Sequence, residues 1–153
     1  MQTKIKQSVI SGIVANVVMT LLMVLGGAIG MPKMSPPDML AGMMKLPMAA
    51  GWVMHFIIGI IFAAGYVFFF NNWLKKISNK IVRGAVYGVV AFIVAQISIP
   101  LMGAIFGDAG MPQPDEGSKA LVMIGSAMGH VIFGIVIALL VKPVVPFTKR
   151  VIK

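Results

Sequence analysis

The side chains in this chain that are best suited to chemistry are its two histidines, His55 and His130. Both lie in long apolar stretches, and small residues stand four positions before and after each of them. These flanking residues are Gly51 and Gly59 for the first histidine, and Ser126 and Gly134 for the second. Residues four apart share one face of a helix, so each imidazole should point toward a closely packed neighbour.

One interpretation of the histidines is a polar network that links the helices. A neutral imidazole in an apolar environment loses the water bound to its donor and acceptor, so it needs a partner or a ligand. Thr20, Asn16 and Gln96 lie at a similar or greater depth in other apolar stretches. Hydrogen bonds among such groups are worth about 1 kcal/mol each.

A second interpretation is a bis-histidine haem b site in an electron-transfer subunit. Equivalent positions on two helices can face each other across the axis of a four-helix bundle, and two neutral imidazoles so placed can ligate haem. Glycines beside both histidines could leave room for the flat macrocycle, although glycine at a helix contact normally indicates close packing. These glycines are Gly51, Gly59, Gly129 and Gly134.

A third interpretation is a copper site, because six of the fourteen methionines lie between residues 31 and 48. Thioether and imidazole ligands together suit Cu(I), and Met39, Met43 and Met44 would be the methionine ligands. Methionine is also a flexible apolar filler of helices at the membrane interface. The chain has no cysteine, which excludes disulfides and thiolate metal sites.

The composition indicates a membrane protein of a single domain, residues 1–153. Hydrophobic residues make up 59% of the chain and charged residues 11%, far from the usual values for soluble proteins. A helix needs about 20 apolar residues to cross the hydrocarbon core. Four stretches meet this length: residues 7–29, 48–70, 81–106 and 120–141. The first is longer than a usual signal-peptide core and lacks a typical cleavage site, so we expect a retained span.

Basic residues predict the orientation of the spans. Ten of them fall on one side of a four-span arrangement, and three fall on the other side together with all four acidic residues. The first group comprises Lys4, Lys6, Lys75, Lys76, Lys80, Arg83, Lys142, Lys149, Arg150 and Lys153. The acids are Asp38, Asp108, Asp115 and Glu116. By the positive-inside rule both termini are cytoplasmic. The net charge of +9 therefore does not indicate nucleic acid binding.

The two halves of the chain share a pattern, which predicts an internal repeat of residues 7–71 and 81–142. At an offset of 80, Asn16 corresponds to Gln96 and Gly27 to Gly107, and the histidine stretches correspond at an offset of 75. The turn Gly30-Met31-Pro32 likewise corresponds to Gly110-Met111-Pro112. The predicted fold is all-α and polytopic, with four transmembrane helices built as two parallel-repeat hairpins.

Helix-start signals mark the loops on the outer side. Ser35 is a predicted N-cap, with Pro36 at the first helical position and Asp38 closing a capping-box-like pattern. The methionine-rich residues that follow predict a short helix in the membrane interface. Ser118 is the predicted N-cap of the fourth span.

Four short motifs resemble a family of small four-helix bacterial inner-membrane proteins of unknown function. They are Met19-Thr20, Gly51-Trp52-Val53-Met54-His55, Pro100-Leu101-Met102-Gly103 and His130-Val131-Ile132-Phe133-Gly134. The resemblance covers most of the chain. It implies the fold and the membrane location, and it implies no activity.

The sequence offers little to an enzyme or a coupled transporter. Motifs for phosphate binding, Ser/His/Asp catalysis and zinc proteases are absent, and the middle of each span has no charged residue. We therefore expect a non-enzymatic protein with a binding or accessory role around His55 and His130. The alternatives are a haem b subunit, a copper-binding protein and a small-solute transporter or channel. Its partners would be the lipid bilayer and a second copy or a larger membrane complex.

Overall fold

The computed structural model describes residues 2–32, 35–107 and 117–142, and within these ranges it contains helices and no strand. Four helices are long: α1 (Gln2–Ala28), α3 (Met48–Gly65), α5 (Lys80–Phe106) and α6 (Lys119–Leu140). The shorter elements are α2 (Pro36–Met44) and, directly after α3, a π-helical turn η1 (Tyr66–Phe70), α4 (Asn71–Trp73) and a 3-10 turn η2 (Leu74–Lys76). The predicted all-α class is confirmed.

The four predicted apolar stretches each form a helix long and apolar enough to cross a membrane. These helical segments are Thr3–Ala28, Met48–Lys76, Lys80–Phe106 and Lys119–Leu140. The second is longer than predicted, because the chain continues from α3 through η1 and α4 without leaving a helical path. Pro100 lies inside α5 and does not end it.

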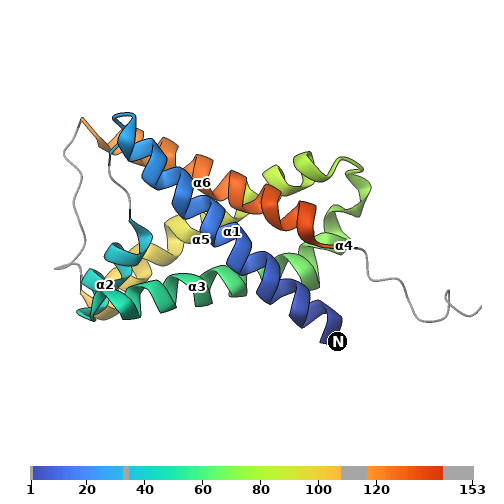
Figure 1. Cartoon of the computed structure of the whole chain (residues 1–153), viewed down its shortest axis with the longest axis horizontal. Coiled ribbons are helices and arrows are strands. Elements are labelled where there is room, and N and C mark those ends of the chain that lie inside the picture. The colour runs from blue at the N-terminus through green and yellow to red at the C-terminus, as the bar shows by residue number, and fades with distance from the viewer. Residues whose placement is uncertain (1, 33–34, 108–116, 143–153) are drawn as a thin grey trace, which may run out of the picture.

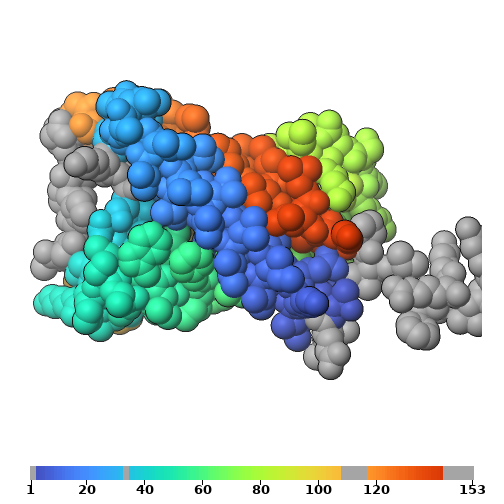
Figure 2. Space-filling view, viewed as in Figure 1, coloured from blue at the N-terminus to red at the C-terminus, as the bar shows by residue number. Residues whose placement is uncertain are grey.

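The first helix is central to the arrangement. α1 packs against both α3 and α6, α5 pairs with α6, and α2 packs on α3. Figure 1 shows the start of α1, the segment after α3 and the end of α6 at one end of the molecule, with α2 at the other. In Figure 2, α1 runs across the middle of the visible face, between α6 and α3.

Glycines set the distance between the paired helices. A Cβ atom added at Gly88 would collide with the backbone of His130 and Val131, and one at Gly134 would collide with Gly84. In the other pair, a Cβ at Gly12 would lie 2.8 Å from the Cα of Ile60. Backbones approach this closely only where side chains are absent, which is the usual role of small residues in membrane helix pairs.

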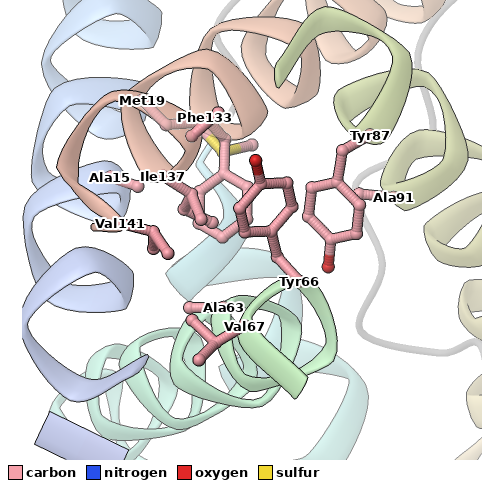
Figure 3. Close-up of a cluster of buried hydrophobic side chains, with 11 residues drawn as sticks. Ala15, Met19, Ala63, Tyr66, Val67, Tyr87, Ala91, Phe133, Ile137 and Val141 are labelled. Atoms are coloured by element: carbon pink, nitrogen blue, oxygen red, sulfur yellow. The ribbon is translucent and has the colours of Figure 1, made fainter. Parts of the chain in front are cut away.

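A cluster of buried side chains joins all four long helices (Figure 3). Tyr66 and Tyr87 stand side by side at its centre, with ring centroids 5.0 Å apart. The Tyr87 hydroxyl donates a hydrogen bond to the carbonyl of Phe62, one turn before the π-helical segment. This bond ties α5 to the place where α3 changes its helical pattern.

The short helix α2 begins at the predicted N-cap, Ser35, but Asp38 does not close the predicted capping box, because its buried Oδ1 atom has no hydrogen-bond partner among the described residues. The Ser35 side chain accepts a hydrogen bond from the backbone N–H of Asp38, at 3.4 Å. Ser118 also stands just before α6, but its φ of −92° and ψ of −16° are helical and its side chain makes no capping bond. An N-cap needs an extended backbone to aim its oxygen at the helix, so Ser118 does not cap α6 as predicted.

Several sequence predictions concern residues outside the described ranges. These residues are Asp108, Asp115, Glu116, Lys149, Arg150, Lys153 and the second turn motif Gly110-Met111-Pro112.

Candidate functional site

His55 lies on α3, inside the bundle, and only 6% of its surface is exposed. Its Nε2 atom is 3.2 Å from the Thr20 hydroxyl oxygen on α1. Two rings of its own helix border the imidazole, with the Trp52 centroid at 6.4 Å and the Phe56 centroid at 5.8 Å. One nitrogen of this buried imidazole, Nε2, is thus satisfied across a helix pair, as its loss of water requires, while Nδ1 has no hydrogen-bond partner among the described residues.

Asn16 completes this group from one turn earlier on α1. Its side-chain amide donates a hydrogen bond of 2.8 Å to the backbone carbonyl of His55, and Asn16 is only 2% exposed. The side-chain amide of Asn16 occupies the space where a Cβ atom of residue 59 would lie. The amide fits there because residue 59 is a glycine. Asn16 and Thr20 are four residues apart and therefore reach α3 from one face.

His130 makes no hydrogen bond to that group. Its Nδ1 atom is 2.8 Å from the carbonyl oxygen of Ser126, on the preceding turn of α6. A carbonyl oxygen can only accept, so Nδ1 carries the proton and the neutral ring presents a lone pair at Nε2. The ring meets Phe92 of α5 edge-on, at 5.8 Å between centroids. Among the described residues, no group is hydrogen-bonded to Nε2 of His130.

Gln96 also lies outside the group around His55. Its amide donates to the Met123 sulfur atom on α6, at 3.0 Å. Of the five side chains predicted to share a network, the structure brings together Asn16, Thr20 and His55. His130 and Gln96 make their contacts elsewhere, between α5 and α6.

The contacts of the histidines also differ from the predicted correspondence between the halves. Asn16 bonds to the carbonyl of His55, and the residue that lies against the carbonyl of His130 is Gly88. Asn16 and Gly88 are 72 residues apart, whereas the sequence pattern pairs Asn16 with Gln96 at 80. Gln96 therefore lies about two helical turns further along its helix than the residue in Asn16's position.

The glycines proposed to make room for haem are filled by protein. Gly51 is covered by Pro37 and Ala41 of α2, and Gly59 by Asn16. Methyl groups of methionines on α1 cover Gly129, and the backbone of α5 covers Gly134. The glycines serve close packing, so the prediction that they leave space for a macrocycle is wrong.

The methionines of α2 behave mainly as apolar packing residues. Met43 is 1% exposed, while Met39 and Met44 are half-buried. The described ranges contain no group of three or more His, Cys, Asp or Glu side chains that could hold a metal ion.

The polar cluster around Tyr66 and Tyr87 was not predicted from the sequence. Arg83, one turn before Tyr87, donates from its guanidinium to the carbonyl of Ile77 and to the side-chain oxygen of Asn71, at 3.5 Å for the latter. The available signal was that these two tyrosines are the only ones in the chain. Their pairing could not be read from spacing, because it depends on how α3 and α5 meet.

Comparison with known proteins identifies a family. The profile of a family described as a family of unknown function, DUF6789, matches residues 2–146. No curated protein and no solved structure gives a significant match. The resemblance to an uncharacterised family, inferred from the short motifs, is thereby confirmed.

A double-mutant cycle should detect the bond between Thr20 and His55. We expect Thr20→Val and His55→Ala each to lower the free energy of unfolding in detergent by about 1–2 kcal/mol. Their combined effect should fall short of the sum by about 0.5–1.5 kcal/mol, since both changes break the same bond. The same cycle between Gln96→Leu and His55→Ala is the control and should be additive. Additivity in the first cycle would contradict the contact.

Visible spectroscopy should give no haem signal. Protein purified in mild detergent from cells with ample haem should lack a Soret band, because the flanking glycines are occupied by side chains and backbone. The His55→Ala and His130→Ala variants should have the same colourless spectrum. A Soret band that shifts with dithionite and disappears in either variant would restore the haem interpretation.

Proposed function

The chain belongs to DUF6789, a family of unknown function, and we propose that it is a non-enzymatic accessory protein of the bacterial inner membrane. In this proposal His130 binds a partner or ligand within the membrane, and His55 holds the helices together. The observation that carries the proposal is where each imidazole is bonded. Nε2 of His55 is bonded to Thr20 on another helix, whereas His130 is bonded only within its own helix, and its Nε2 has no hydrogen-bond partner among the described residues.

The environment of His130 supports a binding role. Its Nδ1–H is fixed by the Ser126 carbonyl, and this second bond sets both the tautomer and the orientation of the ring. Nε2 then holds a lone pair in a fixed direction, where it can accept a hydrogen bond or form a coordinate bond. An unpaired acceptor in an apolar environment costs free energy, so a donor from a ligand or another chain would be favoured there.

The distribution of charge supports four spans with both termini in the cytoplasm. Lysines lie near the start of α1, in η2 and just after α6, which share one end of the molecule in Figure 1. The acid of α2, Asp38, belongs to the opposite end. This segregation is what the positive-inside rule describes.

A single domain of two like-oriented hairpins is part of the proposal. The pairs α1–α3 and α5–α6 each hold one histidine, and each histidine carbonyl faces a residue of the partner helix. The two residues that lie against these carbonyls, Asn16 on α1 and Gly88 on α5, are 72 residues apart in the sequence.

A partner subunit would contact a surface other than the glycine-containing faces of α5 and α6, which already pack against each other. Gly84, Gly88 and Gly134 are used within the chain, between α5 and α6. All four long helices also expose apolar side chains, and the side of α6 near His130, where Met128 is 56% exposed, is the surface that we propose for a second copy or another membrane protein.

Reporter fusions should test the orientation. Fusions after Lys76 and after Lys142 should report the cytoplasm, and a fusion beside Asp38 should report the opposite side. The physical reason is the retention of lysine-rich loops on the cytoplasmic side. A cytoplasmic signal from the fusion beside Asp38 would contradict four spans.

Nitrogen NMR of the two histidines should test the binding role. In protein labelled with ¹⁵N-histidine, the Nε2 resonance of His130 should differ between native membrane vesicles and purified protein, because purification removes its partner. The His55 resonances should not change, since Thr20 belongs to the same chain. Assignment would use His130→Gln and His55→Gln. An unchanged His130 resonance would contradict a bound partner or ligand.

A further inference from the structure

A cavity of about 270 Å³ lies between the first turns of α1 and the end of α6. Its polar lining residues are Thr3, Lys6, Gln7, Ser11 and Lys142, and its apolar lining residues are Ile10 and Leu140. The cavity is partly open to the outside. Its wall is mainly apolar, and two lysines border it at the end of two membrane-length helices.

Hydrogen bonds hold the two sides of this cavity together. The side-chain oxygen of Gln7 accepts from the backbone N–H of Lys142, at 2.9 Å. One turn further into α1, the buried Ser11 hydroxyl donates to the Gln7 carbonyl, at 2.7 Å. Gln7 therefore connects Lys142, two residues after the end of α6, to α1. Lys6 and Lys142 both line the cavity.

No described carboxylate neutralises these lysines. The acid in the described ranges, Asp38, belongs to α2 at the other end of the molecule. At the end of α6, the carbonyls of Leu139 and Val141 accept hydrogen bonds from the Lys80 ammonium group, at 3.4 Å each. These carbonyls therefore do not engage Lys142. Lys6 and Lys142 remain available for an external anion.

We propose that this cavity binds one anionic phospholipid. The phosphate would lie between Lys6 and Lys142, and an acyl chain would leave through the open side along Ile10 and Leu140. Basic pockets between membrane helices at the cytoplasmic surface are known to bind anionic lipid headgroups. The inference is independent of the role of His130.

Two other occupants fit the cavity less well. The sequence that follows Lys142 carries Lys149, Arg150 and Lys153 and no acidic side chain, so it supplies no opposite charge. Free phosphate satisfies the lysines but leaves the apolar wall uncovered. Half of the Ile10 surface and four-tenths of Leu140 are exposed, which an acyl chain would cover.

Native mass spectrometry of the full chain in mild detergent tests the proposal. Delipidated protein is titrated with phosphatidylglycerol or with phosphatidylcholine of the same acyl chains. We expect retention of one phosphatidylglycerol per chain and much weaker retention of phosphatidylcholine. Equal retention of the two lipids would overturn the proposal.

The matched variants are K6Q/K142Q and K75Q/K76Q. Both remove two lysines, and the second pair lies in η2, exposed and outside the cavity. A lysine at an anionic lipid surface contributes roughly a fivefold change in binding, so K6Q/K142Q should weaken phosphatidylglycerol binding roughly 25-fold. The control should weaken it less than about twofold. Similar losses in the two variants would contradict a specific site.

Two further measurements make the outcome unambiguous. The single variants K6Q and K142Q should each lower binding roughly fivefold, which keeps the test valid if the double variant does not fold. Millimolar inorganic phosphate should not displace the lipid from the native protein, because it lacks the acyl chain. Displacement by phosphate would assign the cavity to a free anion and overturn the lipid proposal.

Discussion

The polar side chains inside this helix bundle depend on partners from the chain itself, backbone carbonyls above all, because a hydrocarbon environment offers them no other. Asn16 and Thr20 on α1 meet the carbonyl and the ring of His55 on α3. Ser8 and Ser11 donate to carbonyls one turn earlier on their own helix. Each bond is modest in free energy, but an unmade bond at the same depth would cost more.

The same constraint explains where the glycines lie. Asn16 reaches the backbone of His55 only because residue 59 has no side chain, and α5 reaches α6 only because residues 84, 88 and 134 have none. In the absence of a hydrophobic force between helices in lipid, such close contact supplies most of the attraction. The interhelical hydrogen bond of Asn16 and the close packing of the helices therefore both depend on glycines in this fold.

His130 and the cavity beside Lys6 are two of the places where that internal satisfaction is incomplete; a third is Asp38 of α2, whose buried Oδ1 atom has no hydrogen-bond partner among the described residues. The first leaves an acceptor without a partner in the described chain, and the second leaves two cations without a carboxylate. Both groups gain from something outside the chain, which is why we assign a partner to one and a lipid to the other. Neither requires catalysis, in agreement with spans whose middle parts carry no charge.

The sequence by itself determined the four long helices, the start of α2 at Ser35 and the need of a buried histidine for a partner. Apolar length, capping chemistry and the cost of desolvation act locally, so they can be read along the chain. Only the tertiary structure decided that Thr20 serves His55, that Gln96 lies with Met123, and that methionines and backbone fill the spaces beside the glycines. Helical periodicity places a residue on a face, but the neighbour that meets this face, and its register, follow from how whole helices pack.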